Sequence, residues 1–165
     1  MTMTTRIDIS KPFPPFAPIE AILPHRGTML LLDSIGALSE ESLRAHAFVR
    51  SDAWYADAEG AMPAWIGIEL MAQAIAAHVA LSAMRRGATA RPGVLLGSQR
   101  YEALRPSFAG GSRLVVSATQ LLQSDAGHGA YECAIAIDDV CCAQAVVKVF
   151  QPTDFRSFIE GSVSS

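Results

Sequence analysis

A single carboxylate inside a long apolar stretch is the first feature of the sequence that could do chemistry. Residues 60–84 read GAMPAWIGIELMAQAIAAHVALSAM, and Glu69 is the only formally charged side chain among them. Burying an ionised, unpaired carboxylate costs on the order of several kcal/mol, so Glu69 must be neutral, paired or open to a wet cleft. Gln73 follows at the i+4 position, where its amide can hydrogen-bond the carboxyl group. The same pattern also fits a carboxylate that only ties the helix to an arginine or a backbone amide.

The stretch around Glu69 has the start and stop signals of one helix. Pro63 suits a first helical position, where its missing amide hydrogen is not needed. Arg85 and Arg86 place positive charge at the negative end of the helix dipole, and Gly87 can adopt the left-handed cap conformation. We therefore predict a helix from about Pro63 to Met84.

This predicted helix has no clean polar face, because apolar side chains and alanines occupy positions all round it. Such a helix is wrapped by other structure or by lipid. A membrane span is disfavoured, since Glu69, Gln73 and His78 lie within the run and strand-like sequence flanks it. A long helix clasped by an antiparallel sheet explains the pattern, which is an α+β architecture.

The composition narrows the class of protein. The chain has 165 residues, half of them hydrophobic, and a formal net charge of -3 with scattered basic residues. One domain of this size is expected, and no nucleic-acid partner is expected. The polar start MTMTTRIDIS lacks a secretory pattern, so a cytoplasmic protein is expected. The three cysteines, Cys133 and the adjacent Cys141 and Cys142, fit free thiols better than a disulfide or a zinc site.

The rest of the chain is predicted to form strands. We expect a proline-rich extended arm over 1–18, one domain over 19–151 and a C-terminal tail over 152–165. A short turn is expected at Ile19 to Leu23, followed by a hairpin formed from MLLLDSIGAL and SLRAHAFVR. Four more strands are predicted after the helix, in GVLLGSQRYEAL, SRLVVSATQLLQ, GAYECAIAI and VCCAQAVVKVFQ.

Three segments together resemble a known family. LPHRGTMLLLD at 23–33, MPAWIGIELMAQA at 62–74 and YEALRPSFAGGSRLVVSA at 101–118 are similar to the hotdog-fold 3-hydroxyacyl-acyl carrier protein dehydratases, and most similar to the branch of aryl polyene biosynthesis. The resemblance implies an antiparallel sheet of six or seven strands wrapped around one long central helix, in dimers with active sites between subunits. It also implies that Ala64, Trp65 and Ile66, at the helix start, face the acyl thioester.

Dehydration of a 3-hydroxyacyl thioester needs an acid and a base. Backbone amides at a helix start suit the oxygen of an enolate-like intermediate, and Glu69 lies about 7–9 Å further along the axis. Glu69 could therefore reach the departing hydroxyl and protonate it, if its apolar surroundings keep the acid neutral. A neutral histidine is the natural base for the α-proton.

The usual base of the family is missing from this chain. Where the common dehydratases carry Gly-His-Phe-Pro, this sequence has SDAWYADAEG, with Tyr55 in the register of the histidine. His25, in the PHRG motif, is the leading candidate for the base, although it could instead brace the arm with Arg26. Tyr55 is an alternative for binding or proton donation. His78 is expected to be a satisfied core residue, and His46 and His128 to be exposed to solvent.

Three functions remain open at this point. The chain could be the dehydratase, a hotdog thioesterase in which Glu69 activates water, or a non-catalytic subunit of a heterodimeric dehydratase. No nucleotide or metal cofactor is expected, because GVLLG lacks the spacing of a phosphate-binding loop. Met71 and Ile75 are predicted to set the depth of the acyl tunnel. The implied partners are an acyl carrier protein and a second subunit, identical or related; candidate docking residues for the carrier are Arg85, Arg86, Arg100, Arg105 and Arg113.

Overall fold

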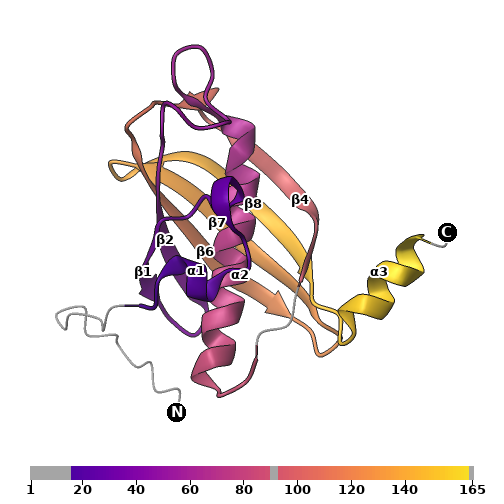
Figure 1. Cartoon of the computed structure of the whole chain (residues 1–165). Coiled ribbons are helices and arrows are strands. Elements are labelled where there is room, and N and C mark those ends of the chain that lie inside the picture. Colours follow the sequence, from indigo (N-terminus) through magenta and orange to yellow (C-terminus); the bar gives the residue numbers. More distant parts are fainter. Residues whose placement is uncertain (1–15, 90–92, 164–165) are drawn as a thin grey trace.

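The computed structural model describes residues 16–89 and 93–163, so most of the predicted arm lies outside the described residues. Its central feature is a six-stranded antiparallel sheet curved around one long helix (Figure 1). The strands follow the order β1-β2-β6-β7-β8-β4, and a separate two-stranded ribbon pairs β3 with β5. The long helix α2 spans Gly67–Arg85 and is preceded by one turn of 3-10 helix, Ala64–Ile66. The predicted α+β architecture is confirmed.

The strands closely follow the predicted segments. The first hairpin consists of β1, Ser34–Leu38, and β2, Ser42–Phe48. The remaining strands of the main sheet are β4, Val94–Ala103; β6, Arg113–Gln123; β7, His128–Ile137; and β8, Val140–Phe150. Only the short ribbon of β3, Met62–Pro63, and β5, Ser107–Phe108, was not predicted, because two residues are too few for a periodic signal.

The core lies between α2 and the concave face of the sheet. Alternate residues of each central strand are buried, as period-2 geometry requires, and they meet the buried residues of the helix. On the sheet side these include Leu43 in β2, Val116 in β6 and Ile135 in β7. Leu70, on the helix, is likewise fully buried. The segment 64–85 is long and apolar enough to cross a membrane, yet 67% of its most apolar window is buried inside the fold. Packing against the sheet therefore accounts for its hydropathy.

Three further helical segments lie around this core: two short ones before β1 and one after β8. The turn predicted near Ile19 is the helix α1, Ile19–Ile22, and a 3-10 turn follows at Gly27–Met29. The predicted tail contains a helix that we missed, α3, Phe155–Val163, which projects from the end of β8 (Figure 1). Asp154 precedes α3, and its carboxylate accepts hydrogen bonds from the Ser157 amide and hydroxyl. An Asp that caps a helix in this way is a signal that the sequence contained.

Candidate functional site

The start of the central helix is held by the β3-β5 ribbon. The amide of Ala64 donates to the carbonyl of Pro106 at 3.0 Å, so it is not available to a substrate oxygen. This corrects the expectation for Ala64, because the ribbon that engages its amide could not be seen in the sequence. Ala64 and Ile66 have buried side chains, whereas Trp65 is 66% exposed. The amides of Trp65 and Ile66 remain as candidates for binding an oxyanion at the positive end of the helix.

The side chain of Gln73 forms a hydrogen-bond network beside Glu69. Its side-chain nitrogen donates to Glu69 Oε1 at 3.0 Å, which confirms the predicted i+4 hydrogen bond. The same nitrogen donates to the carbonyl of Met29 at 2.7 Å. Its oxygen accepts from the amides of Leu31 and Leu32 at 3.0 and 3.3 Å. These two donated and two accepted bonds use the full hydrogen-bonding capacity of the carboxamide, and the side chain is fully buried. Gln73 was predicted to bind substrate, but it positions Glu69 instead.

His25 lies next to Glu69 although 44 residues separate them in the chain. The distance from His25 Nε2 to Glu69 Oε1 is 3.7 Å, beyond a good hydrogen bond but within ion-pair range. The two side chains are 28% and 40% exposed, so each can meet a ligand. His25 Nδ1 is buried, and no hydrogen-bond partner for it is found among the described residues. The structure thus brings the predicted acid and the predicted base together within one chain.

The loop that carries His25 is fixed by its neighbour Arg26. The Arg26 guanidinium donates to the carbonyl oxygens of Leu23 and His25 at 2.6 and 2.7 Å. These bonds fold the arginine back on its own loop. Arg26 therefore stabilises the loop itself, while the imidazole of His25 is directed at Glu69.

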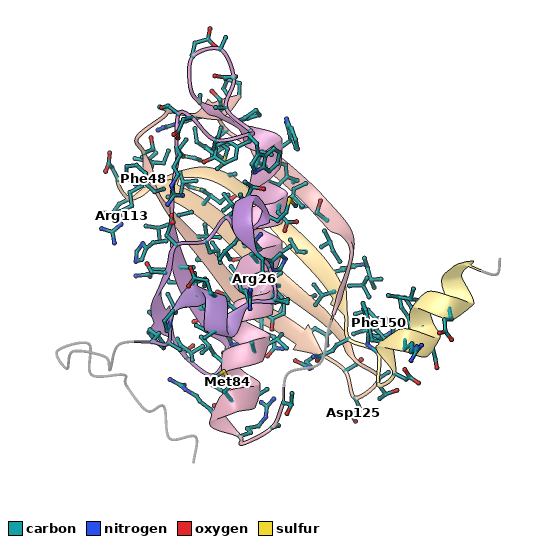
Figure 2. All side chains as sticks on the ribbon, in the orientation of Figure 1. Arg26, Phe48, Met84, Arg113, Asp125 and Phe150 are labelled. Atoms are coloured by element: carbon teal, nitrogen blue, oxygen red, sulfur yellow. The ribbon has the colours of Figure 1, made fainter. Side chains whose placement is uncertain are left out.

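An elongated cavity of about 710 Å³ begins at this pair of side chains. On α2 its lining runs from Glu69 to Ala80, a rise of about 16 Å. The opposite walls come from α1 and the His25 loop, from the paired ends of β4 and β8, and from Phe155 of α3. Figure 2 labels Arg26 on one wall and Phe150 on another, beside the base of α3. Most lining side chains are apolar: Ala21, Ile22, Leu23, Pro24, Ala72, Ile75, Ala76, Val79, Ala80, Val94, Leu95, Val149, Phe150 and Phe155.

Two predictions about the lining need correction. Ile75 borders the cavity as expected, but Met71 is fully buried in the core instead. Tyr55 also lies outside the cavity, and only 8% of it is exposed. Its hydroxyl accepts a hydrogen bond from the Arg50 amide at 3.0 Å, and its ring meets Trp54 edge-on. Tyr55 therefore supports a loop, in place of the substrate contact predicted for it.

The other histidines have structural environments. His78 is buried as predicted: Nδ1 lies 2.9 Å from the Tyr131 hydroxyl and Nε2 lies 3.1 Å from the Glu40 carbonyl. The Glu40 carbonyl can only accept, so Nε2 carries the hydrogen of the neutral ring and Nδ1 accepts from the Tyr131 hydroxyl. Burial raises the pKa of Tyr131 to about 12 and lowers the pKa of His78. His46 is half-buried against Gly36, not exposed as expected, and burial lowers its pKa too. His128 is exposed, and its ring stacks on Phe150.

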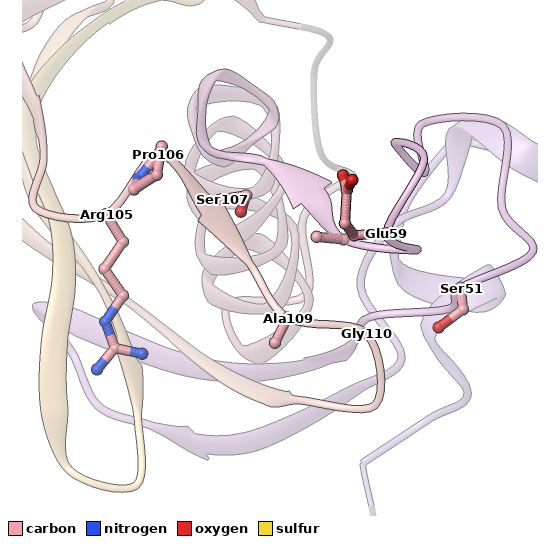
Figure 3. Close-up of a pocket in the computed structure, with 8 residues that line it drawn as sticks. Ser51, Glu59, Arg105, Pro106, Ser107, Ala109 and Gly110 are labelled. Atoms are coloured by element: carbon pink, nitrogen blue, oxygen red, sulfur yellow. The ribbon is translucent and has the colours of Figure 1, made fainter.

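A second hollow of about 570 Å³ lies between the 51–61 loop and the turn around β5 (Figure 3). Arg105 and Glu59 line it, but Figure 3 shows the arginine pointing away from the carboxylate. Neither Glu69 nor His25 belongs to this hollow. Across residues 16–89 and 93–163, no three metal-ligating side chains converge on one point.

The five arginines proposed for docking are all exposed, but they occupy different parts of the fold. Arg85 and Arg86 lie at the far end of α2, about 24 Å along the axis from Glu69. Arg105 lies close to the start of the helix in the chain's pairing: it shortly precedes β5, which pairs with β3, and β3 leads directly into the helix start. No single positive surface is formed by these residues near the acid.

Comparison with known proteins decides the family. A profile described as ApeP-like, ApeP dehydratase, matches residues 17–160. The chain belongs to the ApeP-like dehydratase family. A chain of the dehydratase heterocomplex ApeI:P from Xenorhabdus doucetiae is 25% identical, with coverage of 91% of this chain and 99% of that chain and a TM-score of 0.83. The predicted relation to the dehydratases of aryl polyene biosynthesis is therefore confirmed.

More distant structures share the fold alone. Cj0977, a virulence protein from Campylobacter jejuni, is 13% identical over 84% of this chain and 91% of its own, with a TM-score of 0.65. PaaI from the phenylacetic acid degradation operon of E. coli is 19% identical over 71% and 81% of the two chains, with a TM-score of 0.57. The search of curated proteins gave no match. The hotdog fold implied by the sequence motifs is confirmed for this member of the ApeP-like family.

Proposed function

We propose that this chain dehydrates a (3R)-hydroxyacyl thioester on acyl carrier protein to the trans-2-enoyl thioester, in fatty acid or aryl polyene type biosynthesis. The observation that carries the proposal is the 3.7 Å approach of His25 to Glu69 at the polar end of the apolar cavity. An acid and a base side by side, with room for an acyl chain beyond them, are what the reaction requires. A cytoplasmic location remains a prediction.

In this mechanism the two side chains move two protons. His25 Nε2 removes the α-proton, and the electrons of that C–H bond move through an enolate-like state to form the new C=C bond. The C–O bond at the β-carbon breaks, and Glu69 donates its proton so that the hydroxyl leaves as water. The amides of Trp65 and Ile66 stabilise the enolate oxygen. Protonated His25 then returns a proton to Glu69 across the short gap between them, which resets the pair.

Gln73 keeps the acid in place during this cycle. Its hydrogen bond to Glu69 Oε1 fixes one carboxyl oxygen, while the other remains available to the β-hydroxyl. Because Gln73 also holds the backbone at Met29 and Leu31, the acid is tied to the segment that follows the His25 loop. Precise placement of this kind is worth large factors in rate.

A second candidate is a subunit that acts only in a heterodimeric dehydratase. It is favoured by the likeness to a chain of the ApeI:P heterocomplex and by the absence of Gly-His-Phe-Pro in the sequence. In that arrangement a second hotdog protein would cover the exposed mouth at His25 and Glu69. Activity would then appear only in the mixture of the two proteins.

The test is intact-mass analysis of 3-hydroxyacyl carrier protein incubated with the purified chain, alone and with a second hotdog dehydratase subunit. Loss of one water supports dehydration, whereas release of bare carrier would instead identify a thioesterase. Glu69→Gln and His25→Ala should each lower the rate by roughly 10²- to 10⁴-fold with little change in melting temperature. Glu132→Gln, exposed on β7 and outside the cavity, is the matched control. An unchanged rate in His25→Ala would remove His25 as the base.

A further inference from the structure

The far end of the acyl cavity is built by a part of the chain that the family motifs do not include. Along α2 the lining residues advance from Glu69 through Ile75 and Ala76 to Ala80, so the acid stands at one end. The other walls near that far end come from the start of β4 and the end of β8, where Val94 pairs with Phe150. In Figure 1 these strand ends lie at the same end of the molecule as the C-terminal half of α2.

The helix α3 is fixed to this end by aromatic contacts. The Phe158 ring meets Phe150 edge-on, with ring centroids 5.4 Å apart. On β7, His128 stacks on the same Phe150 ring at 4.6 Å. Asp154 caps the helix, and the Gln151 amide donates to the Gly127 carbonyl at 2.9 Å, which anchors the segment leading into α3. The direction in which α3 leaves the sheet is therefore determined by packing.

This anchoring places Phe155, the first residue of α3, in the cavity lining. Phe155 is partly buried, whereas Ile159, one turn later, is 45% exposed and does not line the cavity. The helix thus contributes one aromatic side chain to the cavity, whereas Phe158 packs on Phe150 and Ile159 lies outside the lining. On α2, the lining residues Ala76 and Ala80 have small side chains, which leaves room for an acyl chain in this part of the cavity.

We propose that Phe155, held by α3, forms the end wall of the acyl cavity and sets the longest acyl chain that the protein accepts. The inference rests on the proposed function only for the nature of the ligand, an acyl chain attached to a pantetheine thioester. The limit is steric: each methylene buried before the wall adds affinity, and a chain that reaches the ring must bend or displace it.

The test measures binding and does not need turnover. A series of 3-hydroxyacyl pantetheine amides of increasing chain length, in which an amide replaces the thioester, is titrated by calorimetry into the full-length protein. In the wild type the Kd should fall about fourfold per added methylene and then stop falling at one chain length. Phe155→Ala should move that break to longer chains, and Ala80→Leu should move it to shorter ones. Ile159→Ala should leave the break unchanged.

The result that overturns the inference is an unchanged break in a folded Phe155→Ala protein, or the absence of any length dependence in the wild type. Melting curves establish whether each variant is folded, and Ala80→Leu decides the question if Phe155→Ala is not. The proposed function is judged separately, by loss of water from the hydroxyacyl carrier protein. Dehydration with an unmoved break would refute the end wall alone, and a moved break without dehydration would refute the proposed reaction alone.

Discussion

Replacing Gln73 by methionine tests whether this residue joins the acid to the loop that follows His25. Methionine has a similar length and is apolar, so the variant fills the space but removes four hydrogen bonds. The amides of Leu31 and Leu32 lose their partner in a buried environment. Leaving a buried donor unsatisfied costs about 1–3 kcal/mol, so the two amides together should lower the free energy of unfolding by about 3 kcal/mol. The carbonyl of Met29, in a partly buried bond, can recover a hydrogen bond from water.

For a domain of this length, that loss corresponds to a fall in melting temperature of about 6–12 °C. Calorimetric or circular dichroism melts at neutral pH measure it directly. Gln144→Met is the matched control, because among the residues that the structure describes the exposed Gln144 side chain donates to Glu102 alone. Loss of this surface bond should cost less than about 0.5 kcal/mol. The control should melt within one or two degrees of the wild type. If Gln73→Met does so too, the hydrogen bonds of Gln73 do not contribute the stability assigned to them.

Two further predictions concern stability. Burial lowers the pKa of His78 from its usual 6.5, so the unfolded chain binds a proton at this residue more readily than the folded protein does. The contribution of His78 to the free energy of unfolding is therefore fully present above about pH 6.5, and it is lost as the pH falls toward the lower pKa of the folded state. His78→Gln should flatten the fall in melting temperature between pH 7.5 and 5.5, whereas His128→Gln on the surface should not; equal slopes in all three proteins would contradict this. Gly110→Ala should lower the melting temperature, because a Cβ there would overlap Ser51 Oγ, while Gly161→Ala has open space around it; equal melts of these two variants would show that the loops are not in contact.

The sequence motifs located the acid well because its surroundings are local. Glu69 and Gln73 share one helix, and the i+4 rule was sufficient to predict their hydrogen bond, which the structure contains. His25 was reached by elimination and by resemblance to the family, and the structure places it at 3.7 Å from the acid. That distance depends on how the loop before β1 folds over α2, which no periodic pattern describes.

The predictions that were wrong depended on contacts between distant segments. Ala64 seemed free because its amide begins a helix, yet Pro106 from another part of the chain accepts its hydrogen. Tyr55 occupied the register of the missing histidine, but its hydroxyl bonds to the Arg50 amide inside a packed loop. Met71 was predicted to set the depth of the tunnel together with Ile75, but its side chain is fully buried in the core.

By itself, the sequence determined the elements of this protein: the strands by alternation, the central helix by its proline start and dibasic end, and the family by three ordered motifs. Those signals act over a few residues, where backbone geometry fixes which side chains share a face. Only the tertiary structure decided which polar groups meet, which amides are already engaged and where the acyl cavity ends. His25 beside Glu69 and Phe155 at the cavity wall arise from packing between segments far apart in the chain, and a local pattern contains no record of that packing.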